Sequence, residues 1–475
     1  MGNRTLRIAY IDDEFFALNS VKRILEDKQS SISHIPIDVD TFHATASLSG
    51  SVDEARLFSG KHNLFLIDRD LGDFRINGSQ LSNEIREKLG PSIRIVELTG
   101  DGRSQNMEGL LEEFKRRQEN VIDDTLIKGA CNPLDLEETI EKHAFRPLTV
   151  SVIGGGNLGR GFLAQFRECP IIRNVNFYSK TEYERDNYEG IKKLLELREY
   201  RFECFPSLET ALFDTDCVLL CKGRAKLSSE KDRSDLLPQS ADIAIMEANS
   251  LIRENYVRTG YKGLVIKFDN PVGENLNLMY RRIKNRINTS QLTFPFNLDT
   301  DRIIKEARLI ARTRKATFTP QMEEFILRNT YGMHGDPRYF ASPSLYLEKG
   351  EMDILDEARE SSVKSGEEMI RLSREYKFPY EQVQRSTIRF LDEIAHYRKF
   401  SSAAAYVYCD FDGINGFTAL PTRLDYGREG VRVKLDKRDG LISRNKEDIR
   451  ELLIKQNRNV DNFLASKDSE INRPS

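Results

Sequence analysis

A run of glycines between an apolar strand pattern and a helical pattern constrains this chain more than any other feature. Residues 148–166 read LTVSVIGGGNLGRGFLAQF, with glycines in the spacing G-x-G-x-x-G. In a strand–turn–helix context, the first glycine permits a tight turn, the second lets the backbone approach a pyrophosphate, and the third lets the helix pack on its strand. The helix N-terminus also offers free N–H groups to phosphates. We therefore predict a dinucleotide site formed by Gly154, Gly156, Asn157, Leu158 and Gly159.

The composition indicates a soluble protein of the cytoplasm. The 475 residues are enough for about three domains. A net charge of −3 gives no general attraction to nucleic acid. No apolar run reaches the length of a membrane span, and the start of the chain does not resemble a signal peptide. The six cysteines form no C-x-x-C pair, which suits a reducing compartment. We expect neither a nucleic acid nor a membrane as a partner.

Strand and helix patterns alternate over residues 1–145. The expected strands are Arg7–Ile11, Leu64–Ile67, Ile93–Leu98 and Val121–Ile127. The expected helices are Phe16–Leu25, Gly78–Leu89, Gly109–Gln118 and Leu134–His143. This alternation predicts a parallel, doubly wound sheet, in which groups at the carboxyl ends of the strands meet in one crevice.

Polar side chains stand at the end of each expected strand. Asp12 and Asp13 follow the first strand, Asp68 the second, Thr99 the third and Lys128 the fourth. Clustered carboxylates suit a hard cation such as Mg²⁺. The hydroxyl and the ammonium group can then stabilise a phosphoryl group placed on Asp68.

This set resembles the receiver domain of two-component response regulators over residues 4–145. The resemblance implies a flavodoxin-like fold and phosphorylation by a histidine kinase or a phosphotransfer protein. It assigns Mg²⁺ to Asp12, Asp13 and Asp68, phosphate acceptance to Asp68, and sensing of the phosphoryl group to Thr99 and Lys128.

The match to the receiver pattern has departures. Asp70 is a rival acceptor, but Asp68 directly ends the apolar strand and has Leu71 three residues on, as the family pattern requires. Gly72 stands where the family usually has a proline, and Thr125 occupies the position of the usual switch aromatic. An inert receiver beside an active second part therefore stays an alternative.

The strand after the glycine turn bears on the choice of cofactor. Asn174–Tyr178 reads as this strand, and Ser179 and Lys180 follow it, about twenty residues beyond Gly159. A site that prefers NAD has an acidic residue there for the ribose hydroxyls. Ser179 and Lys180 suit a 2′-phosphate instead, so NADP is favoured over NAD, and both stay open.

Further polar residues follow strand patterns or share a helix face. A polar loop with Arg233 follows the strand Cys217–Cys221, and a loop of this kind suits closure over an anionic substrate. Asp299 and Arg302 are three residues apart and share a helix face, and His334 stands between two glycines.

Residues 148–465 resemble the lactate/malate dehydrogenase family. The motifs GGGNLG, CKGR…DRSDLL, DNPV, LDTDR and GMHGD occur in the family's order. The resemblance implies a nicotinamide cofactor, a small 2-oxoacid or 2-hydroxyacid as substrate, and a homo-oligomer, either a dimer or a tetramer. We therefore expect an α/β chain with three domains: a receiver (1–146), a Rossmann NAD(P)-binding domain (147–294) and an α+β dehydrogenase-type catalytic domain (295–475).

The resemblance also assigns catalytic roles that agree with the chemistry of the side chains. Arg302 binds the substrate carboxylate with a bidentate fork. Asp299 orients His334, which exchanges the hydroxyl proton. Arg233 polarises the substrate oxygen, and Asn270 helps to fix this oxygen and the nicotinamide.

The position that reads the far end of the substrate stays open. Counted from Gly223 it is Lys226, and counted back from Arg233 it is Leu227, because the loop has one extra residue. A lysine indicates a second substrate carboxylate, and a leucine indicates an apolar 2-oxoacid.

The C-terminal third completes the expected architecture. We expect a helix over Pro343–Tyr376, strands over Ser402–Asp410 and Gly430–Leu435, a closing helix over Glu447–Leu464, and a frayed polar tail. The sequence thus predicts a receiver-regulated 2-hydroxyacid dehydrogenase. The alternative is a non-enzymatic signalling protein whose dehydrogenase-like part senses a nucleotide or metabolite or serves as an interaction platform.

Overall fold

The computed structural model describes residues 6–14, 17–23, 37–44, 52–59, 61–72, 77–89, 93–99, 121–127, 135–136, 139–140, 143–145, 147–166, 169, 171–179, 201–205, 208–212, 215–222, 237–253, 263–268, 270–283, 288–340, 346–376, 381–396, 398, 401–427, 430–437 and 440–471. The chain forms two compact units. The first consists of Met1–Pro147, Asp392–Lys399 and Tyr426–Arg428, and the second of the remaining residues. The division into three domains stays a prediction.

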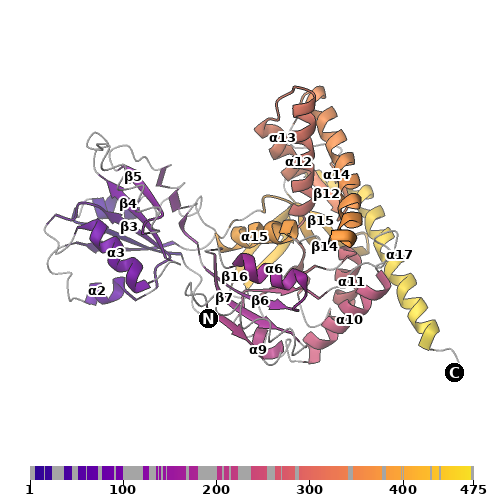
Figure 1. Ribbon diagram of the computed structural model, residues 1–475, viewed down its shortest axis with the longest axis horizontal. Coiled ribbons are helices and arrows are strands. Elements are labelled where there is room, and N and C mark those ends of the chain that lie inside the picture. Colours follow the sequence, from indigo (N-terminus) through magenta and orange to yellow (C-terminus); the bar gives the residue numbers. More distant parts are fainter. Residues whose placement is uncertain are drawn as a thin grey trace. The chain divides into compact units, whose positions relative to one another are not determined.

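Among the described residues, the first unit contains a parallel sheet of five strands in the order β2-β1-β3-β4-β5 (Figure 1). The strands are β1 (Leu6–Asp12), β2 (Ile37–His43), β3 (Leu64–Asp68), β4 (Arg94–Thr99) and β5 (Asp124–Ile127). The helices α2 (Val52–Leu57) and α3 (Gly78–Leu89) lie between strands in the chain.

The sequence does not predict β2, because Asp38 and Asp40 interrupt its apolar pattern. Burial alternates at the start of this strand, as in a strand with one solvated face. The helix expected over Gly109–Gln118 lies outside the described residues, and the helices expected over Phe16–Leu25 and Leu134–His143 are described only in part.

Alternate side chains of the central strands fill two apolar clusters. In β1, Ile8 and Tyr10 belong to one cluster, and Ala9 and Ile11 to the other. Successive side chains of a strand point to opposite faces of the sheet. Both faces are therefore covered, which is why these strands are nearly continuous apolar runs.

The second unit contains a six-stranded parallel sheet in its described part, with the order β11-β10-β9-β6-β7-β8. The strands are β6 (Leu148–Ile153), β7 (Ile172–Tyr178), β8 (Arg201–Cys204), β9 (Cys217–Leu220), β10 (Leu264–Lys267) and β11 (Leu292–Thr293). This order, read from β8, is the 3-2-1-4-5-6 order of the Rossmann fold. The predicted Rossmann sheet is confirmed. The helices α6 (Asn157–Phe166), α9 (Leu208–Leu212), α10 (Leu237–Arg253) and α11 (Val272–Ile283) belong to this part.

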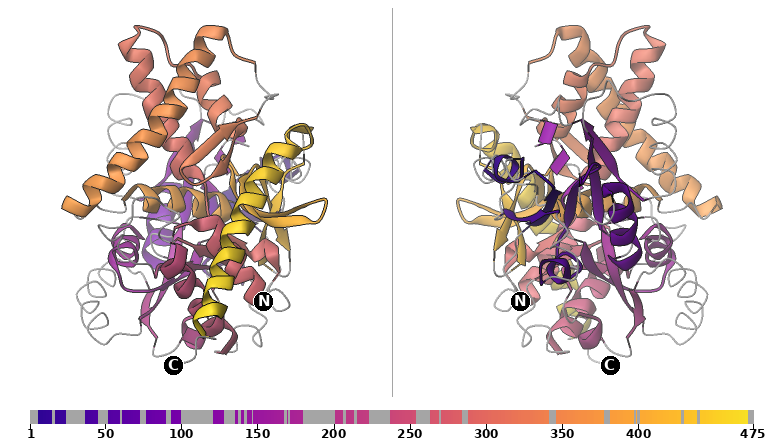
Figure 2. Two further views of the ribbon diagram at one scale, coloured as in Figure 1. Left: turned by 90° about the vertical axis from the view of Figure 1, so that its right-hand side faces the viewer. Right: turned by 90° about the vertical axis from the view of Figure 1, so that its left-hand side faces the viewer.

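The remainder of the chain adds antiparallel strands and long helices. The strands β12 (Thr330–Met333), β13 (Asp336–Tyr339), β14 (Ala405–Phe411) and β15 (Ile414–Leu420) form a sheet, and β16 (Thr422–Gly427) pairs with β17 (Gly430–Leu435). The helices are α12 (Asn297–Thr313), α13 (Pro320–Asn329), α14 (Lys349–Tyr376), α15 (Glu381–Ala395), α16 (Leu441–Arg444) and α17 (Lys446–Ile471) (Figure 2).

Two predicted boundaries in this part differ from the structure. The closing helix α17 continues to Ile471, beyond the predicted end at Leu464, because residues such as Ala465 and Lys467 are good helix formers although the tail is polar. The helix predicted from Pro343 begins at Lys349.

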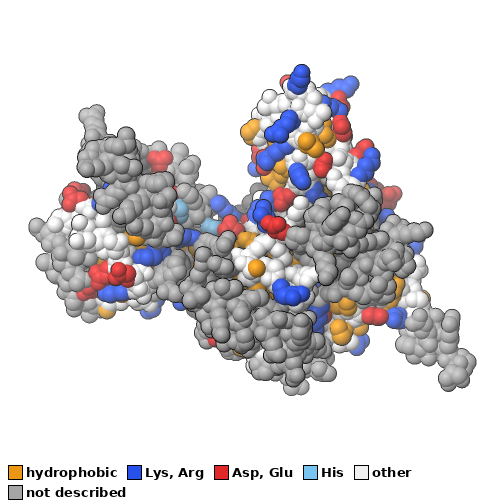
Figure 3. Space-filling view, in the orientation of Figure 1, with side chains coloured by type: hydrophobic (Ala, Val, Ile, Leu, Met, Phe, Trp, Pro, Cys, Tyr) orange, Lys and Arg blue, Asp and Glu red, His pale blue; other side chains and the backbone are white. Residues whose placement is uncertain are grey.

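The surface of the helical layer α12–α14 carries charges of both signs (Figure 3). Lys and Arg side chains alternate there with acidic ones, and exposed pairs such as Arg308–Glu323 and Arg314–Glu357 join neighbouring elements. No helix in the described ranges is both long enough and apolar enough to cross a membrane.

A charged pair is buried inside the Rossmann part. Nζ of Lys267, at the end of β10, lies 2.5 Å from Oε2 of Glu247 in α10, and these side chains are 0% and 3% exposed. Burial, together with the nearby Glu247 carboxylate, raises the pKa of the Cys221 thiol well above its usual range. Cys221 is therefore a neutral, structural thiol.

Breaking this pair is expected to destabilise the protein strongly. Lys267→Ala leaves the Glu247 carboxylate buried beside a lost cation, so the free energy of unfolding falls by about 3–5 kcal/mol. The double variant Lys267→Met/Glu247→Leu removes both charges, so its free energy of unfolding is expected to fall less than that of Lys267→Ala. Urea unfolding measures both, and Arg314→Ala at an exposed pair serves as a control with a change below about 1 kcal/mol. If the double variant loses at least as much unfolding free energy as Lys267→Ala, the unpaired Glu247 charge is not the cause of the destabilisation.

Candidate functional site

The structure contains the predicted glycine-rich turn between β6 and α6. Gly154 has φ of 109°, a conformation that favours glycine. A Cβ atom added to Gly159 would lie 2.1 Å from the carbonyl oxygen of Gly154, so only glycine lets α6 pack this closely. The space beside Gly156 is open within 4 Å, and Gly156 and Asn157 are exposed at the start of α6. Leu158, the next residue of α6, is half-buried.

The residues predicted to choose between NAD and NADP are described only in part. Ser179 directly follows β7, and its side chain is buried, with 3% exposure. Lys180 lies outside the described residues, as do Lys226, Leu227 and Arg233 of the polar loop. Their roles stay predictions.

The structure brings together Asp299 and His334, although 35 positions separate them in the chain. Nδ1 of His334 lies 2.6 Å from Oδ2 of Asp299, and the backbone N–H of Gly335 donates to Oδ1 at 3.1 Å. Both carboxylate oxygens are thus engaged by one turn. The side chains of His334 and Asp299 are 8% and 3% exposed, so water competes little for this contact.

Each partner occupies a position that its local sequence enforces. Asp299 lies in the first turn of α12, where the helix dipole favours a negative charge. His334 and Gly335 form the two-residue turn between β12 and β13, because Met333 pairs with Asp336. The flanking Gly332 has φ of 125° and Gly335 has φ of 84°, which explains the two glycines around the histidine.

A histidine held in this way is chemically suited to proton exchange. A carboxylate that accepts a hydrogen bond from Nδ1–H fixes the tautomer and leaves Nε2 as the atom that exchanges a proton. The ring of Phe294 contacts the imidazole edge to face, with centroids 5.9 Å apart, and further limits its orientation.

Sequence reasoning did not identify Tyr406, which supports the histidine from β14. The backbone N–H of His334 donates to the Tyr406 hydroxyl at 2.6 Å, and Tyr406 is 1% exposed. A buried tyrosine needs a hydrogen-bond partner, which is a signal present in the sequence. The identity of the partner depends on tertiary structure and cannot be read from the sequence.

Arg302 and Asn270, the other residues predicted to bind the substrate, lie on α12 and directly before α11. Arg302 is half-buried on α12, one helical turn after Asp299. Asn270 precedes a cis peptide bond to Pro271, directly before α11. The Oδ1 atom of Asn270 is buried and has no hydrogen-bond partner among the described residues, so it offers an acceptor to a ligand.

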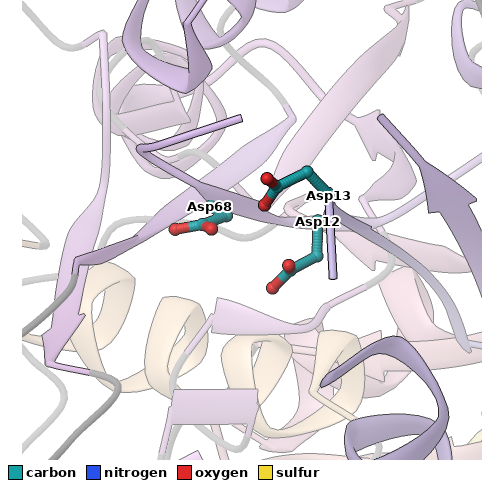
Figure 4. A group of neighbouring side chains, drawn as sticks. All are labelled: Asp12, Asp13 and Asp68. Atoms are coloured by element: carbon teal, nitrogen blue, oxygen red, sulfur yellow. The ribbon is translucent and has the colours of Figure 1, made fainter. Parts of the chain in front are cut away.

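A second cluster lies in the first unit. Asp12, Asp13 and Asp68 each offer a carboxylate oxygen, and these oxygens lie within 4.8 Å of one another (Figure 4). β1 and β3 are neighbours in the sheet, so the ends of these strands meet as predicted. Three carboxylates at this separation fit a divalent cation with oxygen ligands.

Neighbouring groups position this cluster. The hydroxyl of Tyr10 donates to Oδ2 of Asp12 at 2.6 Å, and the backbone N–H of Glu14 donates to Oδ1 at 2.8 Å. Thr99 ends β4, next to β3 in the sheet, and is 6% exposed. Lys128 lies outside the described residues.

Sequence reasoning also missed a buried carboxylate beside the predicted acceptor. Glu97 in β4 is 0% exposed and accepts from Oγ of Ser82 at 2.7 Å and from the guanidinium group of Arg69 at 3.3 Å. Arg69 directly follows Asp68. The carbonyl of Arg69 accepts from the N–H of Gly78. A Cβ atom added to Gly78 would lie 1.8 Å from the carbonyl oxygen of Asp68. Gly78 therefore lets α3 start directly against the backbone of Asp68.

Removing the Tyr406 hydroxyl tests the support of the histidine. Tyr406→Phe leaves the backbone N–H of His334 without its acceptor in a buried place, so the free energy of unfolding falls by about 1–3 kcal/mol. Chemical denaturation measures this change. Tyr346→Phe, at an exposed tyrosine, is the control and leaves stability unchanged. Equal stability of Tyr406→Phe and the parent protein contradicts the proposed role of the hydroxyl.

Comparison with known proteins extends the description of the fold. Lactate dehydrogenase from Eimeria maxima, crystallised with NADH and oxamate, is similar with a TM-score of 0.50 and 16% identity, over 70% of this chain and 97% of that chain. Malate dehydrogenase from Cryptosporidium parvum has a TM-score of 0.49 and 17% identity, over 66% of this chain and 99% of that chain. No protein-family model and no curated protein matches this sequence.

The similarity to the Eimeria maxima enzyme establishes the fold alone. More than two thirds of this chain has the α/β architecture of that dehydrogenase, with a Rossmann-like parallel core.

Proposed function

We propose that this chain is an NAD(P)-dependent 2-hydroxyacid dehydrogenase of the lactate/malate type, regulated by a receiver domain at residues 1–146. The observation that carries the enzymatic part is the contact of 2.6 Å between Nδ1 of His334 and Oδ2 of Asp299. It occurs in a fold similar to that of a lactate dehydrogenase and turns a buried imidazole into an oriented proton acceptor.

The residues of the site divide the work of the reaction. Arg302 binds the substrate carboxylate through a bidentate fork. His334 removes the hydroxyl proton while the hydride leaves the same carbon, and it returns the proton in the reverse direction. Arg233 stabilises the charge that develops on the substrate oxygen, and Asn270 offers its buried Oδ1 to the bound ligands. When bound, the nicotinamide accepts or donates the hydride.

The cofactor site is supported by the glycine turn. Gly154, Gly156 and Gly159, with Asn157 and Leu158 at the start of α6, would hold the pyrophosphate. Ser179 and Lys180 would receive the ribose or its 2′-phosphate, which favours NADP while NAD stays open. The substrate is a small 2-oxoacid or 2-hydroxyacid. If Lys226 contacts the far end of the substrate, the substrate is a dicarboxylate. If Leu227 does so, the substrate is an apolar 2-oxoacid.

The first experiment follows absorbance of the reduced nicotinamide, with NADH and NADPH each tested against a panel of 2-oxoacids. The parent protein is expected to oxidise one of them. His334→Ala lowers kcat/KM by about 10²–10⁴-fold because the general acid is lost. Arg302→Ala is expected to lose activity to a similar extent, and Arg312→Ala at the exposed end of α12 retains it. Binding of the nucleotide without turnover of any 2-oxoacid would instead favour the non-enzymatic sensor.

The regulatory part rests on the carboxylate cluster and the strand order of the first unit. The order 2-1-3-4-5 is one of the doubly wound orders, found in flavodoxin-like sheets. Asp12, Asp13 and Asp68 would hold Mg²⁺, and Asp68 would accept a phosphoryl group from a histidine kinase or phosphotransfer protein. Thr99 and Lys128 would sense it.

Coupling to the dehydrogenase is supported by the composition of the first unit. Residues 392–399 and 426–428, far along the chain, belong to this unit together with the N-terminal sheet. Tyr426 packs against its apolar cluster, and its hydroxyl donates to the carbonyl oxygen of Arg398 at 3.0 Å. These segments continue directly along the chain into the second unit. A conformational change in the receiver would therefore reach the catalytic part through them.

Acetyl phosphate with Mg²⁺ is expected to label Asp68. Asp68→Asn abolishes the label, and Asp70→Asn, which removes the rival carboxylate, retains it. Turnover and oligomeric state are then measured with and without the label. Failure to label the parent protein would support an inert receiver. That alternative is suggested by Thr125, which occupies the position of the usual switch aromatic. Labelling without any change in turnover or assembly would reject the coupling.

A further inference from the structure

A polar cavity of about 300 Å³ lies in the second unit, and it is lined by residues other than those assigned to catalysis. It is bordered by α11, the β14–β15 hairpin and α17, which lie side by side in the structure, and it opens to solvent (Figures 1 and 2). Its lining consists of Asn277, Tyr280, Arg281, Tyr408, Asn415 and Asn457. This volume is at the lower end of the range for small-molecule sites.

Two tyrosines form a rigid aromatic wall. The rings of Tyr280 and Tyr408 have centroids 4.9 Å apart, and each also contacts Phe417 of the apolar core. Tyr280 and Arg281 follow Asn277 by three and four residues on α11, so all three share one helix face. The wall and the polar groups are therefore fixed relative to one another before any ligand arrives.

Asn277 supplies an oriented donor. It is 3% exposed, and its Oδ1 accepts from the backbone N–H of Phe417 at 2.9 Å, which fixes the orientation of the amide. The Nδ2 group is buried and has no hydrogen-bond partner in the part of the chain that the structure describes. A buried donor left without a partner costs about 1–3 kcal/mol, so an acceptor atom beside it is strongly favoured.

The neighbouring α17 contributes a polar side chain to the lining. Asn457 lines the cavity and donates from Nδ2 to the carbonyl of Asn415 at 2.9 Å. An interface between two helices that were merely packed together would be filled with apolar side chains instead.

Arg281 gives the cavity its charge. Its Nη1 lies 2.6 Å from Oδ1 of Asp461, and its Nη2 donates to Oδ1 of Asn457 at 3.2 Å. Asp461 is 64% exposed, and such an exposed ion pair contributes little stability. A ligand carboxylate can therefore share or replace Asp461 as the partner of the guanidinium group.

We propose that this cavity is a second ligand site, which binds a small organic carboxylate. Arg281 pairs with the carboxylate, Nδ2 of Asn277 donates to an acceptor oxygen of the ligand, and the Tyr280–Tyr408 wall contacts its carbon skeleton. The site is distinct from the one that contains Arg302 and His334.

The second site lies on the same sheet as the candidate catalytic turn. Tyr408 lines the cavity, and Tyr406, two residues earlier on β14 and on the same face of the sheet, accepts from the backbone of His334. On β15, Oγ1 of Thr418 donates to the carbonyl of Gly332 at 3.0 Å. A ligand that contacts Tyr408 and Asn415 therefore binds to strands that also hold the segment of the histidine.

Calorimetric titration of the full chain with malonate, succinate and inorganic phosphate tests the proposal. Saturable binding of a carboxylate is expected in the parent protein and in Arg302→Ala, because the second site does not use Arg302. Asn277→Asp keeps the acceptor for the N–H of Phe417 but replaces the donor by a negative oxygen, and Arg281→Gln removes the cation. Each is expected to weaken binding at least tenfold.

Arg282→Gln is the matched control, since Arg282 is the next residue on α11 and its Nε donates to Asn249 at 2.5 Å, outside the lining. It retains the affinity of the parent protein. If Asn277→Asp does not fold, Arg281→Gln, at a side chain that is 39% exposed, decides the test alone. Binding that survives Asn277→Asp and Arg281→Gln, binding of phosphate alone, or no saturable binding in Arg302→Ala overturns the proposal.

Discussion

Parallel strands place all of their carboxyl ends along one edge of the sheet, and both units of this protein depend on that constraint. In the first unit, the ends of β1, β3 and β4 bring Asp12, Asp68 and Thr99 to one edge. In the second, the end of β6 carries the glycine turn and the end of β7 carries Ser179. The same geometry therefore positions both the carboxylate cluster of the first unit and the glycine-rich turn of the second.

The candidate catalytic pair is built differently, from elements that meet only through tertiary packing. Asp299 comes from the start of a helix and His334 from a hairpin turn, and Tyr406 reaches the same turn from a third element. Each of the three side chains is nearly enclosed, so the hydrogen bonds between them are little screened by water. The geometry of the Asp299–His334 contact is therefore set largely by the residues that surround the pair.

Sequence reasoning succeeded where local chemistry is decisive. The apolar runs of β1, β3, β4 and β9 and the glycine turn are local signals, and the sequence predicts them with nearly the observed bounds. The strands β2 and β8 were missed. In β2, aspartates interrupt the apolar pattern, because this edge strand has one solvated face.

The same limit holds for the sites. Asp299 and His334 were proposed from their motifs, but their separation of 2.6 Å could not be known from the sequence. Lys267 and Glu97 stand inside apolar runs, where spacing gives no reason for a charge, and only their partners Glu247 and Arg69 explain them. A buried polar group is explained by its partner, and the two partners lie far apart in the chain. The sequence alone therefore does not reveal them.

The two-residue turn that carries His334 has a consequence for how such a protein can diversify. Insertion or deletion of one residue in β12 or β13 would turn alternate side chains to the opposite face and carry the histidine away from Asp299. The length of this hairpin is therefore fixed by its chemistry.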